Sequence, residues 1–72
     1  MAIVKVIEIL AESDTSWEDA AQRALDEASM TVRNIRSIYI KEMQAIVKDN
    51  KIDKFRIDAK ISFLVDDQLR EE

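Results

Sequence analysis

The chain has 72 residues, of which 47% are apolar and 36% charged, and its formal net charge is −4. It contains no Cys, His, Gly or Pro, which excludes disulfides, thiolate metal sites and Gly-rich phosphate loops. The acidic balance argues against a nucleic-acid partner, because phosphate contacts need a basic surface. The chain has neither an apolar run of about 18 residues nor the start of a signal peptide. We therefore expect a single cytoplasmic domain, residues 1–72, with no membrane partner.

Residues 3–10 are rich in β-branched side chains and predict a strand with apolar residues on both faces. The polar residues 11–16 that follow predict a loop. Within this loop, Thr15 and Glu18 fit a capping box at the start of a helix, and Ser13 is an equally suitable N-cap.

A helix is predicted next, because apolar residues recur at helical spacing. Most of its apolar stripe is Ala, so we expect the helix to lie close against a sheet. Asn34 is the residue expected to adopt a left-handed conformation at the helix end. The stripe consists of Trp17, Ala20, Ala21, Ala24, Leu25, Ala28 and Val32.

Two further strands are predicted, over residues 35–47 and 52–65. Residues 48–51, Lys-Asp-Asn-Lys, separate them and predict a tight turn, because Asp and Asn tolerate positive φ. The last strand alternates strictly between apolar and polar side chains. Residues 66–72 are polar and are expected to fray.

The order β-α-β-β predicts an α+β fold. The helical crossover makes the first two strands parallel, and the third fits between them in an antiparallel sheet of order 1-3-2. One helix covers only one face of such a sheet. The first strand has apolar residues on both faces, so we expect self-association to cover the other face.

Few residues suggest chemistry. Ser13, Thr15 and Ser16 have no His to act as a base, and we find no catalytic constellation, so we expect no enzymatic activity. Trp17 is expected to pack at the helix end. Carboxylates are the only plausible metal ligands, and they favour calcium or magnesium if symmetry gathers several copies. The candidates are Glu8, Glu12, Glu42, Asp53 and Asp58.

The pattern resembles the dodecins, small proteins that assemble twelve copies into a hollow shell. The resemblance covers residues 3–66 and implies a homododecamer that binds or stores a small ligand or ion. It is carried by four segments in order: Val4-Lys5-Val6-Ile7-Glu8-Ile9, Ser16-Trp17-Glu18-Asp19-Ala20-Ala21, Ala28-Ser29-Met30-Thr31-Val32-Arg33-Asn34-Ile35, and Phe55-Arg56-Ile57 through Ile61-Ser62-Phe63.

Many dodecins hold flavins in pairs, with a Trp stacked on the ring and a Gln on its polar edge. Those positions correspond here to Ser37 and Arg56, so flavin binding is expected to be weak or lost. Tyr39 shares the face of Ser37 and is a candidate substitute. Arg56 is a candidate for a flavin phosphate or for an interface salt bridge with Glu42 or Asp58.

The resemblance is greatest to a dodecin subgroup that lacks the Trp and has been linked to calcium. Three readings stay open at this point. The shell binds a small ligand or a cation such as calcium, it binds flavin through a modified site, or it is a purely structural assembly.

Overall fold

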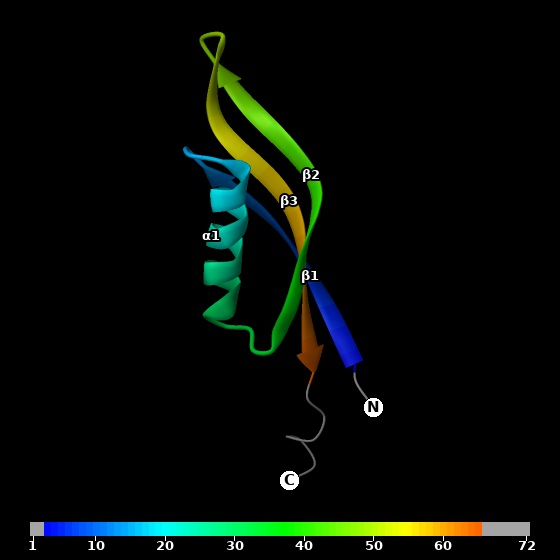
Figure 1. Ribbon diagram of the computed structural model, residues 1–72. Helices are drawn as coiled ribbons and strands as arrows, with labels where there is room; N and C mark the ends of the chain where they lie inside the picture. The colour runs from blue at the N-terminus through cyan, green and yellow to red at the C-terminus, as the bar shows by residue number, and fades with distance from the viewer. Residues whose placement is uncertain (1–2, 66–72) are drawn as a thin grey trace.

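The computed structural model describes residues 3–65, and the predicted frayed tail lies outside this range. Its elements follow the predicted order: β1 (Ile3–Ser13), α1 (Trp17–Ser29), β2 (Ile35–Lys48) and β3 (Lys51–Val65). The three strands form an antiparallel sheet in the order β1-β3-β2, as predicted. Figure 1 shows the sheet strongly twisted, with α1 lying across one of its faces.

The hairpin between β2 and β3 forms where the sequence predicts it. Asp49 and Asn50 both have positive φ, at 55° and 63°, as a two-residue turn of this kind requires. The register of β2 shifts three times along β3, and one shift lies between Ile40 and Glu42. The extra residue there is Lys41, and the bulge keeps both ends of β2 paired to β3.

The core is a thin layer between α1 and the sheet. Three alanines one helical turn apart, Ala20, Ala24 and Ala28, are buried on α1. They face Ile57, Ala59 and Ile61, which lie at alternate positions on β3 and are fully buried. Small side chains let the helix approach the sheet closely, which confirms the interpretation of the alanine stripe.

The N-terminus of α1 is capped one residue later than predicted. Ser16 is the N-cap, and its Oγ accepts a hydrogen bond from the Asp19 amide at 2.9 Å. The capping box from Thr15 to Glu18 was therefore wrong. Ser13 is no cap, yet its buried hydroxyl accepts from the Thr15 amide and donates to the Asp19 carboxylate. The Ser13 hydroxyl, and then Arg23, lower the pKa of Asp19.

Two boundaries differ from the prediction. β1 continues to Ser13, because residues 11–13 stay paired with Arg56 and its neighbours on β3. Local polarity had predicted a loop there. Asn34 does adopt positive φ, at 63°, but α1 ends five residues earlier, at Ser29, with Met30 as its C-cap. Asn34 therefore shapes the entry into β2, and its carbonyl accepts from the Leu64 amide.

Candidate functional site

The sheet face turned away from α1, called here the outer face, has no helix over it in the described part of the chain. On β3 it carries the polar residues that alternate with the buried Ile57, Ala59 and Ile61. Three apolar side chains on the outer face are more than half exposed to solvent. The exposed fractions are 56% for Val4, 55% for Val6 and 67% for Leu10. Its residues include Val4, Val6, Glu8, Leu10, Glu12, Ser37, Tyr39, Glu42, Gln44, Lys54, Arg56, Asp58, Lys60 and Ser62.

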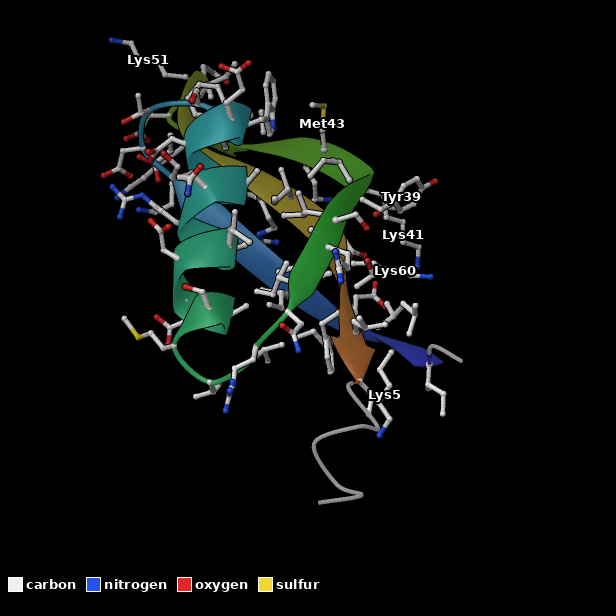
Figure 2. The ribbon with its side chains drawn as sticks, turned by 60° about the horizontal axis from the view of Figure 1, so that its bottom comes forward. Lys5, Tyr39, Lys41, Met43, Lys51 and Lys60 are labelled. Atoms are coloured by element: carbon white, nitrogen blue, oxygen red, sulfur yellow. The ribbon has the colours of Figure 1, made fainter. Side chains whose placement is uncertain are left out.

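All three residues predicted for ligand binding lie on the outer face. Ser37 shares a hydrogen bond of 2.6 Å with Ser62, which lies opposite it on β3. Tyr39 is 63% exposed and lies opposite Lys60. Figure 2 shows Tyr39 on the same side of the sheet as Lys41 and Lys60. The ring of Tyr39 is therefore free to contact a planar molecule or a neighbouring chain.

A single chain does not bring Ser37 and Arg56 together. Ser37 lies opposite Ser62, and Arg56 is six residues earlier on the same strand. At about 3.3 Å per residue they are roughly 20 Å apart. A site that uses both residues therefore needs two copies of the chain.

Arg56 is held by residues of its own chain. Its guanidinium forms an ion pair with Glu12, directly opposite on β1, with Nε 2.7 Å from Oε2. It also donates to the Gln44 side chain at 3.3 Å. Within the chain, the acid that pairs with Arg56 is Glu12. The expected salt bridge with Glu42 or Asp58 across an interface between copies stays a prediction. The acid comes from β1, where Glu12 lies opposite Arg56. Local sequence does not reveal which residues of β1 and β3 lie opposite each other.

Trp17 packs at the helix end, as expected. Its indole Nε1 donates to the Gln44 carbonyl at 2.9 Å. Its ring meets Phe55 edge-on, with centroids 4.9 Å apart. Trp17 thus ties the start of α1 to β2 and β3.

An acidic pair, Glu8 and Asp58, lies near the middle of the outer face. Hydrogen bonding between the two carboxyl groups is the main reason why the pKa of Asp58 is raised and that of Glu8 is lowered. Lys41 lies 3.5 Å from the Glu8 carboxylate and lowers its pKa further. The Asp58 Oδ1 atom is buried without a hydrogen-bond partner. The pair therefore favours holding one proton between two carboxylates.

Replacing Asp58 with Asn should change how stability depends on pH. A raised carboxyl pKa contributes stability at low pH that is lost as the pH rises through the folded-state value. The lowered pKa of Glu8 has the opposite effect, because it contributes stability that is lost as the pH falls. Once both acids are ionised they repel each other, and Glu42 also repels Asp58, with partial relief from Lys41 and Lys60.

We expect Asp58→Asn to be the more stable protein at about pH 7.5 and to lose that advantage near about pH 4.5. Urea midpoints at one fixed protein concentration measure the effect, with Asp53→Asn as the control. Asp53 lies near the hairpin turn, away from the pair. An equal advantage at both pH values would contradict the shared proton.

The five carboxylates named as candidate metal ligands lie in different surroundings. Glu42 lies opposite Asp58 in the register, next to the acidic pair. Glu12 is engaged by Arg56, and Asp53 belongs to the hairpin. Over residues 3–65, no three acidic side chains of one chain are close enough to hold a metal ion. The sequence did not predict that Glu8 lies close to Asp58. Alternation shows that both residues share a face of the sheet, but only the register of β1 against β3 shows that they are neighbours.

Comparison with known proteins gives a consistent result. The family model for Dodecin matches residues 3–66. The curated calcium dodecin of Mycobacterium tuberculosis is 36% identical over 63 residues, which is 88% of this chain and 89% of that protein.

Solved structures agree with this match. The crystal structure of the Mycobacterium tuberculosis calcium dodecin, described as having a novel calcium-binding site, has a TM-score of 0.77 and 36% identity, covering 85% of this chain and 87% of that one. The dodecin of Streptomyces davaonensis has a TM-score of 0.84 at 22% identity, covering 90% and 96%, and shows the fold alone. By sequence over residues 3–66, and by fold, this chain belongs to the dodecin family.

Proposed function

We propose that this chain, as a single domain, assembles into a closed shell of twelve copies that binds or stores a small ligand or ion. The observation that carries the proposal is the uncovered outer face. Val4, Val6 and Leu10 are more than half exposed there, and a small domain with one thin core gains stability by covering them. The membership of the dodecin family supports the assembly, and nothing in the site supports catalysis.

A divalent cation such as calcium is the favoured ligand. Glu8, Asp58 and Glu42 lie near one another on the three neighbouring strands of the outer face. The Asp58 Oδ1 atom has no hydrogen-bond partner. Within residues 3–65, one copy does not gather enough carboxylates, so the proposed site combines residues of neighbouring copies. The calcium dodecin relative supports this choice of ion.

Flavin is the second candidate ligand, because the family is known for it. Ser37 offers no stacking surface, and Arg56 is already engaged by Glu12 and Gln44. We therefore propose that flavin binding is weak, with the exposed Tyr39 as the only aromatic ring of the outer face among residues 3–65. No helix in this part of the chain is long and apolar enough to cross a membrane.

Removing divalent cations tests the ion site. Twelve chains of net charge −4 carry a formal charge of about −48, and bound cations would reduce their mutual repulsion. We expect a chelator to lower the mass of the assembly at low ionic strength, and added calcium to restore it. Light scattering coupled to gel filtration measures the mass. An unchanged mass would contradict a structural cation site.

A further inference from the structure

Lys41 has an unusual position on the outer face, because it is the extra residue of the bulge between Ile40 and Glu42. Regular pairing would place Lys41 opposite Asp58 and would turn Glu42 toward α1. The bulge instead places Glu42 opposite Asp58. Lys41 stays on the outer face, and Figure 2 shows it on the same side of the sheet as Lys60. An acid and a cation of β2 therefore lie together beside Asp58.

The Lys41 ammonium lies beside the acidic pair but is held there loosely. Its Nζ atom is 3.5 Å from Glu8 Oε2, which is the longest ion-pair contact among residues 3–65. Charge-assisted hydrogen bonds between nitrogen and oxygen are usually about 2.7–2.9 Å long. The side chains of Lys41 and Glu8 are both almost half exposed, and ion pairs this exposed contribute little to stability. Lys41 can therefore leave Glu8 at little cost.

The charge of Lys41 acts on both members of the acidic pair. The pKa of Glu8 is lowered by hydrogen bonding to Asp58 and then by Lys41, whereas Lys60 contributes least although it lies opposite Glu8. The pKa of Asp58 is raised by its hydrogen bond with Glu8 and by burial, and Lys41 opposes this rise. Among the described residues, Lys41 is therefore the principal counter-ion of the pair.

The acidic pair has an oxygen to offer to a second cation. The Asp58 Oδ1 atom is buried without a hydrogen-bond partner, and carboxylate oxygens are the ligands that calcium prefers. Lys41 cannot be a ligand itself, because an ammonium group has donors only. Its positive charge would also repel a cation bound to the same carboxylates. Lys41 and a divalent cation therefore compete for the pair.

We propose that Lys41 is a tethered counter-ion, which neutralises the Glu8–Asp58 pair in the cation-free protein and leaves it when a divalent cation binds there. The inference rests on the proposed cation site and names the residue that sets its affinity. Lys41 lowers the affinity for the cation, because the ion pair with Glu8 must be given up on binding. In return, it limits the repulsion among the acids of the outer face while no cation is bound.

Titration calorimetry with calcium chloride, at one fixed ionic strength, tests the competition. Lys41→Gln removes the charge beside the pair, and Lys48→Gln is the matched control, because it removes the same charge from the same strand. Lys48 forms no salt bridge within residues 3–65. We expect Lys41→Gln to bind calcium at least about tenfold more tightly than Lys48→Gln. Lys41→Arg, which keeps the charge, should bind calcium as the unmodified protein does.

Urea unfolding with a chelator and with calcium gives a second readout. With the chelator, Lys41→Gln should unfold at a lower urea concentration than the unmodified protein, and calcium should raise its midpoint more than that of Lys48→Gln.

The possible failures are distinct. Calcium binding by Lys41→Gln that is no tighter than that of Lys48→Gln would overturn the role of Lys41 and leave the cation site in place. Weaker binding would show that Lys41 supports the bound cation, which also overturns the competition. If neither the unmodified protein nor any variant binds calcium, the proposed cation site fails, and the role of Lys41 fails with it.

Discussion

Replacing Ser37 with Trp and Arg56 with Gln should raise the affinity for riboflavin by roughly 30- to 10,000-fold. A Trp at position 37 supplies a stacking surface worth about 1–3 kcal/mol. Gln at position 56 offers both a donor and an acceptor to the flavin edge, where Arg offers donors only. Leaving one buried polar group of the flavin unpaired costs about 1–3 kcal/mol.

The structure shows what these substitutions disturb. Ser37→Trp removes the hydrogen bond to Ser62, and Arg56→Gln releases Glu12 from its ion pair. Both residues lie on the outer face, so neither substitution creates a cavity in the core. We expect Ser37→Trp alone to give the larger part of the gain.

Quenching of riboflavin fluorescence measures the affinity, and light scattering checks that the assembly is intact. Arg36→Gln, the same exchange at the second residue of β2, is the control. Tight binding of flavin by the unmodified protein would contradict the assignment of positions 37 and 56, and Tyr39→Ala would then show whether Tyr39 stacks on the ring. An intact assembly without any gain would show that the copies do not form a flavin site from positions 37 and 56.

Replacing Ile61 with Ala should cost about 2–5 kcal/mol of stability. Ile61 is fully buried and packs between Ala24 and Ala28 of α1 and the neighbouring strands. The facing helix residues are already Ala, so no side chain can expand into the space that the substitution leaves. Such a loss is a large part of the whole stability of a small domain.

Urea unfolding at one fixed protein concentration, followed by circular dichroism, measures this effect. Ile61→Val should cost about 0.5–1.5 kcal/mol, because it leaves a smaller cavity. Met30→Ala, at a widely exposed residue, should stay within about 0.5 kcal/mol of the unmodified protein. A cost for Ile61→Ala no greater than that for Met30→Ala would show that the thin layer under α1 is not the core.

The order of elements and the topology of the sheet could be predicted from the sequence. Alternation in β3 and the alanine stripe in α1 are strong local patterns, and Asp49 and Asn50 specify a tight turn with positive φ. Errors arose where partners distant in sequence decide the structure. Ser13 looks like a loop residue locally, but pairing with Phe55 keeps it in β1.

The site was less predictable than the fold. Ser37 and Tyr39 were correctly placed on one face, because their alternation in β2 is undisturbed between them. The partner of Arg56 and the acidic pair of Glu8 with Asp58 depend on the register of β1 against β3. Register is set by many weak contacts along both strands, and no single residue of either strand specifies it.

Native mass spectrometry of protein purified without added ligand tests the central claim most directly, because it counts the chains and weighs what they hold. We expect a single assembly of twelve chains of 8.3 kDa, about 100 kDa, that carries bound calcium or another small ligand and no flavin. A species of one or two chains, at about 8 or 17 kDa, would contradict the shell. Twelve chains with nothing bound would contradict the storage of a ligand and leave a structural assembly.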